Sequence, residues 1–176
     1  QVLLREGADY TGLEIEPDFV REAKSKLSEF GDLVSIVQGD MRSFRLDKKF
    51  DLIFIGFNSF LHLLTDKDAM DFFHCVQNHM YNNTRFFIDI YIPHPLFLYR
   101  PEGVRFPVLE YTDSNTDEHV FVDESNVYHS VTEINELTWY FSTENKKDIA
   151  KEHFSMRMYF PSKMNQLLID AGFKIL

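Results

Sequence analysis

Apolar residues follow a distinctive pattern in the first half of the chain. Four short runs, each nearly continuous in apolar residues, are typical of strands covered on both faces, and they lie at residues 10–15, 34–38, 50–57 and 85–92. Longer stretches separate these runs, and there the apolar residues recur every three or four positions, as they do in helices. Because strands and helices alternate, we predict a parallel sheet with right-handed crossovers.

Two helices in this half have recognisable ends. The first is predicted from Pro17, a favoured first helical residue, to Gly31, a common helix terminator. The second is predicted to follow Thr65 and Asp68, which resemble a helix cap. Its apolar stripe consists of Ala69, Met70, Phe73, Val76 and Met80.

A period of two replaces this pattern between Val108 and Phe160. Apolar residues alternate with polar ones, most clearly from Phe154 onwards, and polar clusters such as "DSNTDE" and "TENKKD" separate the runs. We predict an antiparallel β meander inserted into the α/β fold. A helix should return at Pro161 and end at Gly172, with a last strand at 173–176.

The fold class is therefore α/β, with a mostly parallel sheet and an inserted antiparallel meander. Residues 1–107 are predicted to form the first part of the α/β core, 108–160 the antiparallel insertion and 161–176 the return to the core. A length of 176 residues suits one structural domain with a sizeable core.

Composition excludes several classes of partner. The formal net charge of −10 at pH 7 repels phosphate backbones, and the scattered Lys and Arg form no basic patch, so we expect no nucleic-acid partner. No apolar run approaches the roughly 20 residues of a membrane span. A single cysteine, Cys75, excludes an internal disulfide, and the seven dispersed histidines indicate no metal site. We expect a cytoplasmic enzyme without a membrane partner.

Carboxylates stand where two of the predicted strands end. Glu14 ends the first strand and Asp40 follows the second, while Asn58 and Ser59 follow the third. Ligands of open α/β sheets bind at the carboxyl ends of the strands. One carboxylate there can accept hydrogen bonds from a ribose diol and another from the amine of adenine. Alone, either residue could equally be a turn cap or a solvated strand end; together they favour a nucleoside site.

Four segments of the chain resemble one enzyme family. In order and spacing, the chain is similar to class I S-adenosylmethionine-dependent methyltransferases at "YTGLEIEP", "VQGDMRSF", "FDLIFIGFNSFLHL" and "MYFPSKMNQLLIDAGFKI". The resemblance covers nearly the whole chain and is strongest to small-molecule N-methyltransferases. It implies a Rossmann-like cofactor-binding part over residues 1–107.

The resemblance also implies roles for the residues at the strand ends. Glu14 would bind the ribose hydroxyls of S-adenosylmethionine, and Ile15 would pack on adenine. Asp40 would accept the adenine amine, with Met41 contributing its backbone N–H.

The loop after the third predicted strand is implied to lie beside the methyl group. Phe57, Asn58 and Ser59 would contact the cofactor there, and Asn58 and His62 are the candidate catalytic residues. His62 could equally be a structural histidine at the start of the next helix. Methyl transfer to a neutral amine depends on positioning and desolvation, so it needs no strong base.

The insertion supplies the candidate substrate contacts. Tyr128, Arg157 and Tyr159 combine apolar surface with polar tips, which suits a pocket for a small-molecule acceptor. Arg157 could pair a substrate carboxylate or phosphate, or one of the chain's own acidic residues. The aromatic insertion is also the expected interface of a homodimer.

One departure from the family is the absence of a glycine-rich G-x-G loop, which would precede Gln1. In the family, that loop ends a strand between those that carry Glu14 and Asn58. We therefore expect that this polypeptide alone binds the cofactor weakly, or that another molecule completes its sheet. Two other functions stay open: a non-catalytic relative that binds a ligand or partner, and a nicotinamide-dependent oxidoreductase that uses Glu14 for a dinucleotide ribose.

Overall fold

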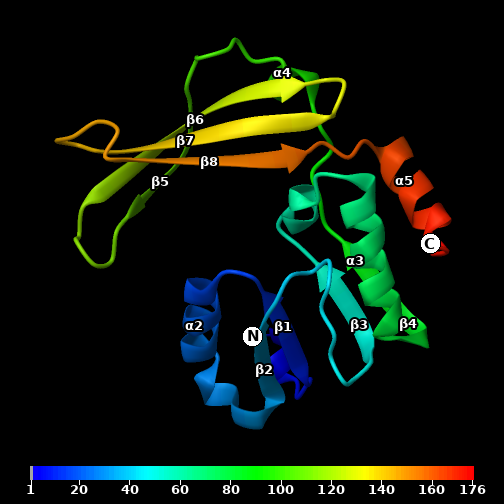
Figure 1. The fold of residues 1–176 in the computed structure, drawn as a ribbon. Coiled ribbons are helices and arrows are strands. Elements are labelled where there is room, and N and C mark those ends of the chain that lie inside the picture. Colours follow the sequence, from blue (N-terminus) through cyan, green and yellow to red (C-terminus); the bar gives the residue numbers. More distant parts are fainter. Residues whose placement is uncertain (1) are drawn as a thin grey trace. The chain divides into compact units, whose positions relative to one another are not determined.

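A computed structural model describes residues 2–176, which form two compact units (Figure 1). Unit 1 comprises the chain up to Ile53 together with Met70–Arg85. Unit 2 comprises Phe54–Ala69 and Phe86–Leu176. Three elements contribute residues to both units: strand β3 (Phe50–Ile55), helix α3 (Asp66–Asn78) and strand β4 (Met80–Ile88).

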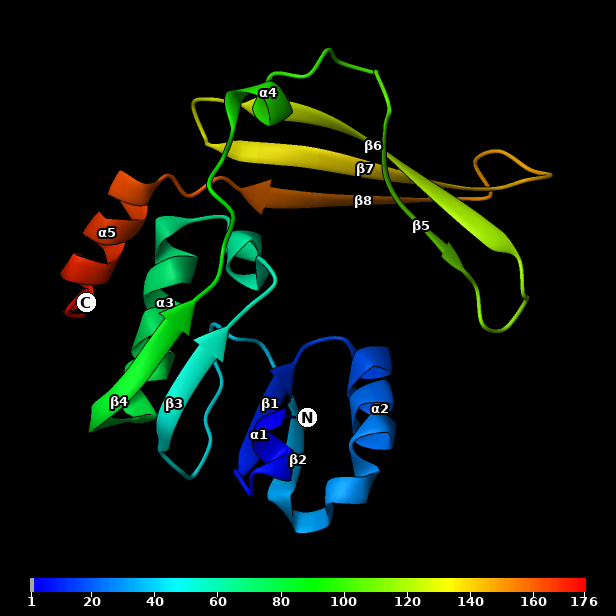
Figure 2. The same cartoon turned by 180° about the vertical axis from the view of Figure 1, so that it is seen from behind.

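Unit 1 contains a short helix and a parallel strand–helix–strand motif. The helix α1 (Val2–Arg5) precedes β1 (Tyr10–Glu14), α2 (Pro17–Lys26), the 3-10 helix η1 (Ser28–Leu33) and β2 (Val34–Gln38). Strands β1 and β2 pair in parallel, with Tyr10 opposite Val34 and Glu14 opposite Gln38. Helix α2 runs beside the two strands (Figure 2). The predicted parallel crossover is confirmed.

The first helix ends earlier than the sequence suggested. Helix α2 stops at Lys26, and Gly31 lies inside η1 with a φ of +53°, in the left-handed region that favours glycine. The apolar spacing continues across this junction to Leu27 and Phe30, because residues three apart share a face in a 3-10 helix as well as in an α-helix. The prediction of one helix up to Gly31 was therefore wrong.

The helix cap at Thr65 and Asp68 is confirmed. The Asp68 backbone N–H donates to Thr65 Oγ1 at 3.0 Å, and the Thr65 N–H donates to Asp68 Oδ2 at 3.2 Å. Met80, predicted to continue the apolar stripe of α3, instead begins β4. Strand β4 ends at Ile88, four residues before the predicted end. The pairing of this segment with β3 continues beyond Ile88, because the Asp89 N–H donates to the Ile55 carbonyl at 2.9 Å.

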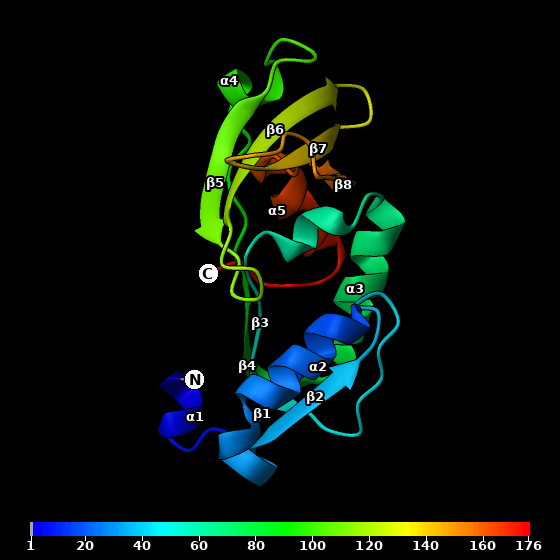
Figure 3. The ribbon, with the colours of Figure 1, turned by 90° about the vertical axis from the view of Figure 1, so that its left-hand side faces the viewer.

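Unit 2 is built on the antiparallel sheet (Figure 3). Its strands β5 (Phe106–Thr112), β6 (His119–His129), β7 (Ile134–Thr143) and β8 (Ala150–Arg157) follow one another in chain order. The predicted meander is therefore confirmed. Three helices belong wholly to unit 2: η2 (Ser59–His62), α4 (Pro95–Leu98) and α5 (Pro161–Asp170).

The last predicted strand does not form. Residues 173–176 are in no strand among the described residues, because a β ladder needs a neighbouring strand to accept its hydrogen bonds. Phe173 instead packs its ring against Phe86, with the ring centres 5.5 Å apart. Gly172 does end α5 as predicted, with a φ of +84°. The division at residues 107/108 and 160/161 stays a prediction.

Candidate active site

In unit 1, Glu14 and Asp40 stand at one edge of the parallel strand pair. Glu14 is the last residue of β1, and Asp40 lies two residues beyond the end of β2. The Gly39 N–H donates to the Glu14 carbonyl at 2.9 Å, which extends the ladder up to Asp40. Glu14 Oε1 accepts the Glu16 N–H at 2.8 Å. Its Oε2 makes no hydrogen bond to the described part of the chain, so it can receive a ligand hydroxyl.

Asp40 is already paired in the free protein. Its Oδ1 accepts the backbone N–H of Arg42 at 2.8 Å, and the Arg42 guanidinium donates to both oxygens, the shortest contact being Nη2 to Oδ2 at 2.6 Å. This hydrogen bonding lowers the pKa of Asp40 from its ordinary value, so it is a carboxylate at neutral pH. A ligand amine at Asp40 must displace an N–H of Arg42, a competitor that the sequence reading missed.

Apolar surface flanks the two carboxylates. Ile15 is 60% exposed and Met41 is half-buried. A hollow of about 240 Å³ opens beside Glu14 and is lined by Tyr10, Gly12, Leu13, Glu14, Phe19, Ala23 and Ile36. A Cβ at Gly12 would lie 3.0 Å from Ile36 Cδ1, so a larger residue there would require the Ile36 side chain to shift. The edge thus offers acceptor oxygens beside exposed aliphatic surface.

In unit 2, the loop after β3 is held in an unusual conformation. Phe57 and Asn58 both have positive φ, at 53° and 62°, which non-glycine residues rarely adopt. The Asn58 N–H donates to the Asp89 carbonyl at 3.2 Å, and Asn58 Oδ1 accepts the Tyr91 N–H at 2.8 Å. Phe57 is left 96% exposed. Residues 57–59 are therefore fixed by the chain that follows β4.

Asp89 and Tyr91 were missed by the sequence reading. Besides its backbone bonds, Asp89 accepts the Phe57 N–H on Oδ2 at 3.4 Å. The available signal was the segment "IDIYI", in which these two polar residues interrupt an apolar run. They set the geometry of the loop that the sequence reading did identify.

His62, in η2, is exposed, and its ring centre lies 6.3 Å from that of Phe154 on β8. It therefore stands at the surface of unit 2 next to the antiparallel sheet.

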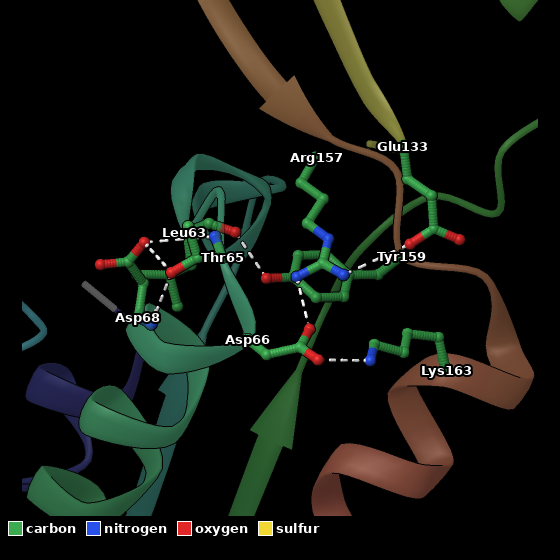
Figure 4. Close-up of polar contacts among 8 residues, drawn as sticks. All are labelled: Leu63, Thr65, Asp66, Asp68, Glu133, Arg157, Tyr159 and Lys163. Atoms are coloured by element: carbon green, nitrogen blue, oxygen red, sulfur yellow. Dashed lines mark hydrogen bonds and ion pairs between the residues drawn. The ribbon is translucent and has the colours of Figure 1, made fainter. Parts of the chain in front are cut away.

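Arg157 and Tyr159 are buried within unit 2 (Figure 4). Arg157, 8% exposed, donates to Asp66 Oδ1 at 2.6 Å and to Glu133 Oε2 at 3.4 Å. Lys163 of α5 also donates to Asp66, at 2.6 Å. Of the two roles weighed for Arg157, the structure shows pairing with the chain's own acidic residues.

Tyr159 supports the segment that carries His62. Its hydroxyl donates to the Leu63 carbonyl, and its ring packs against Phe60 with the centres 4.8 Å apart. Burial raises the pKa of Tyr159 to about 12, so the hydroxyl stays protonated at neutral pH.

Tyr128 on β6 is half-buried, and its ring meets Tyr99 edge to face at 5.6 Å. Burial raises the pKa of its hydroxyl. Tyr128 thus remains accessible at the sheet face, unlike Tyr159.

The contacts of Asp66 with Arg157 and Lys163 predict that the stability of the protein depends on pH. Hydrogen bonding from Lys163, and then from Arg157, lowers the pKa of Asp66 below its ordinary value of 3.8. A lowered pKa stabilises the folded state at pH values above the unfolded pKa, and this contribution is lost as pH falls through the folded pKa. We expect Asp66→Asn to lower the free energy of unfolding at pH 7 and the difference from wild type to shrink below about pH 4. Urea unfolding at both pH values measures this; a difference that persists at low pH contradicts it.

The antiparallel sheet also carries a buried carboxylate, Glu124 on β6. It is 7% exposed, and its Oε1 and Oε2 accept Arg100 Nη1 at 3.1 Å and Trp139 Nε1 at 2.8 Å. Burial, and then the charge of Glu124, raises the pKa of Tyr91 to about 12. Sequence reading did not single out Glu124; its signal is a charged residue on the face of β6 that also carries the buried Val120 and Val122.

Comparison with known proteins shows a similarity to methyltransferases. A family model described as a methyltransferase domain matches residues 1–83. Solved structures of methyltransferases match the fold of 99% of the chain. Residues 1–83 therefore resemble a methyltransferase domain, and the chain has the fold of these methyltransferases. No curated protein sequence matches it.

Three solved structures illustrate the likeness of this chain to known folds. An S-adenosylmethionine-dependent methyltransferase from Clostridium acetobutylicum is 20% identical with a TM-score of 0.77, and the CcbJ methyltransferase from Streptomyces caelestis is 15% identical with a TM-score of 0.80. The glycopeptide N-methyltransferase MtfA is 18% identical with a TM-score of 0.61. Each match covers 99% of the chain but only 67–68% of the solved structure. The chain therefore has their Rossmann-like fold and spans about two thirds of their length.

The described residues contain neither a membrane-spanning helix nor a cluster of metal ligands. Over residues 2–176, no helix of the chain combines the length and the apolar character needed to cross a bilayer. In the same range, no three His, Cys, Asp or Glu side chains gather as a metal site would require.

Proposed function

We propose that this chain is a methyltransferase, that the Glu14–Asp40 edge of unit 1 binds the nucleoside of S-adenosylmethionine, and that the methyl group is transferred to a small-molecule amine. The observation that carries the proposal is the placement of two carboxylates at the same end of adjacent parallel strands. The two carboxylates lie at the carboxyl ends of the parallel strands, which is where open α/β sheets bind their ligands.

The residues of this edge fit a nucleoside. The unpaired Oε2 of Glu14 would accept a ribose hydroxyl, and Asp40 would accept the adenine amine in place of one Arg42 contact. Ile15 would pack on the base through its exposed side chain, and Met41 would offer its backbone N–H. MtfA, a structural neighbour, has been crystallised with S-adenosylmethionine, S-adenosylhomocysteine and sinefungin, which supports this choice of ligand.

The bound cofactor would supply a methyl group on a sulfonium, which needs positioning more than acid–base help. Phe57, Asn58 and Ser59 would provide that positioning, because Asp89 and Tyr91 hold Asn58 in one conformation. Exposed Phe57 would exclude water from the reacting groups. Asn58 and His62 remain the candidate catalytic contacts to the acceptor.

The acceptor would meet Tyr128 on the sheet, while Arg157 and Tyr159 support the site by fixing Leu63 and Asp66. An amine acceptor is supported by two structural neighbours, the glycopeptide N-methyltransferase MtfA and the amino pentose methyltransferase CalS10. We also propose a cytoplasmic enzyme that dimerises through the antiparallel sheet.

A thermal-shift titration with S-adenosylhomocysteine tests the proposed function, with NAD as the control dinucleotide. A ligand at 100-fold excess over its dissociation constant adds roughly 2.7 kcal/mol of stability. For a chain of this length, the melting temperature should rise by roughly 5–10 °C with S-adenosylhomocysteine only. A rise with NAD alone would overturn the methyltransferase site and favour an oxidoreductase.

Removing the competitor of the adenine amine should strengthen binding. The Arg42–Asp40 pair is partly exposed, with side chains 48% and 26% accessible, so breaking it costs about 0.2–1 kcal/mol. Arg42→Ala should therefore tighten S-adenosylhomocysteine binding by about 1.5- to 5-fold in a calorimetric titration at pH 7. Arg21→Ala, which removes the exposed pair with Asp18, is the matched control and should change nothing. Weaker binding to the Arg42 variant would show that Arg42 itself contacts the ligand.

A further inference from the structure

A polar group stands in the middle of the aromatic face of the antiparallel sheet. Glu124 on β6 and Trp139 on β7 lie directly opposite each other in the strand register. The Trp139 ring meets Phe154 of β8 edge to face, with the ring centres 5.4 Å apart. A buried carboxylate costs free energy unless its oxygens are hydrogen-bonded, so its partners define its role.

The partners of Glu124 leave acceptor capacity at its oxygens. A carboxylate has about four acceptor positions, and the Arg100 and Trp139 contacts use two of them. The guanidinium of Arg100 stacks on the rings of Phe97 at 4.8 Å and Phe106 at 4.3 Å, which fixes its position. The Trp139 N–H is used by Glu124 itself. A ligand group that adds to this carboxylate must therefore be a hydrogen-bond donor.

Tyr91, like Glu124, offers an oxygen that can only accept a hydrogen bond from a ligand. Its hydroxyl donates to Met158 Sδ at 3.0 Å, so its oxygen offers only lone pairs. Its ring meets Phe97 edge to face at 5.9 Å. The surroundings of Glu124 thus combine acceptor oxygens with aromatic rings, the combination that suits a donor-bearing organic amine.

Two chains of contacts inside unit 2 connect this group to the candidate catalytic residues. Tyr91 donates its backbone N–H to Asn58 Oδ1. At the other side, His62 neighbours Phe154, and Phe154 contacts Trp139. Asn58 is therefore hydrogen-bonded directly to Tyr91, and His62 is connected to Trp139 through the ring of Phe154.

We propose that Glu124 is the residue that selects an amine as the methyl acceptor, by accepting a hydrogen bond from the amino group while Trp139 and Tyr91 pack against the carbon skeleton. This inference rests on the proposed function. It specifies a primary or secondary amine, because such an amine keeps an N–H for Glu124 and a lone pair for the methyl group. Tertiary amines and alcohols of the same shape bind more weakly.

A purely structural role makes a different prediction. Arg100 and Glu124 pair, and Asn126 Nδ2 donates to the Leu98 carbonyl at 3.2 Å, so β6 anchors the segment at Leu98 and Arg100. If anchoring were the whole role, Arg100→Met and Glu124→Gln would have the same consequences. If Glu124 selects the amine, Arg100→Met keeps the selection and Glu124→Gln loses it.

The experiment uses Trp139, the single tryptophan of the chain, as a fluorescent reporter. Glucosamine is titrated against glucose, and cyclohexylamine against cyclohexanol, with and without S-adenosylhomocysteine. In wild type, each amine should half-saturate the signal at a concentration about tenfold lower than its alcohol, as a charge-assisted hydrogen bond implies. Asp123→Asn is the matched control, since Asp123 neighbours Glu124 but lines a hollow with Arg105 and Ser142 on the other face of the sheet.

Glu124→Gln should reduce the amine-to-alcohol ratio to within about twofold of unity, while Asp123→Asn and Arg100→Met retain it. Equal response to amine and alcohol in wild type overturns the inference. So does an unchanged ratio in Glu124→Gln. Calorimetry with S-adenosylhomocysteine tests the cofactor site separately from amine selection by Glu124. If the protein prefers amines but does not bind S-adenosylhomocysteine, the cofactor site is refuted and the role of Glu124 is not.

Discussion

Replacing Phe60 by alanine is expected to destabilise unit 2 by about 3–5 kcal/mol, the usual loss for a buried phenylalanine. Phe60 has no exposed surface, and its ring packs against Tyr159. Truncation would leave a cavity beneath η2, the helix that carries His62, and beside the Tyr159–Leu63 hydrogen bond. Methyl transfer should fall with stability, because Asn58 and His62 lose their support.

Urea unfolding followed by Trp139 fluorescence measures this loss, since Trp139 lies in unit 2. Phe57→Ala is the matched control three residues away. Phe57 is 96% exposed, so its removal should change the unfolding free energy by less than about 0.5 kcal/mol. Phe57→Ala should nevertheless slow methyl transfer. Equal stability of the two variants would refute the packing described for η2.

Loss of both carboxylates in unit 1 is expected to weaken S-adenosylhomocysteine binding by at least about 100-fold. Hydrogen bonds to charged groups contribute about 1.5–3 kcal/mol each, so Glu14→Ala and Asp40→Ala should each cost about 10- to 100-fold in affinity. The double variant removes the acceptors for both the ribose and the adenine amine. Calorimetric titration gives the affinities.

Asp18→Asn is the control for these variants. Asp18 lies in the first turn of α2, and its side chain is 71% exposed, so it tests whether charge alone matters. The Asp18→Asn variant should bind S-adenosylhomocysteine with the affinity of wild type. Binding by the double variant within about threefold of wild type would exclude this edge as the nucleoside site, because the lost hydrogen bonds could not then contribute the expected 1.5–3 kcal/mol each.

Several local features of the fold follow from the sequence because they depend on neighbouring residues. Strand β2 has the predicted bounds, since its apolar run stops at Gly39. The Thr65–Asp68 cap joins residues three apart, so its geometry is available from spacing. Strand β4 was misplaced because its start, "MYNNT", is polar and its pairing depends on β3.

Side-chain partners were harder to predict than elements. Asp66 and Arg157 pair across 91 residues of sequence, and nothing near either residue favours one acidic partner over the many others. Arg42 lies two residues from Asp40, yet its choice of that carboxylate depends on the path of the loop after β2. Glu124 is inconspicuous in the sequence, because the meaning of a buried carboxylate comes from the residues that cover it.

By itself, the sequence determined the α/β class, the antiparallel meander and the carboxylates Glu14 and Asp40 at strand ends, because apolar periodicity and chain order fix which strand ends carry them. Tertiary structure alone decided which polar groups are already occupied. It paired Arg157 with Asp66, placed Arg42 on Asp40 and surrounded Glu124 with aromatic rings. The physical reason is that hydrogen bonding and burial depend on distances between residues far apart in the chain, which periodicity does not encode.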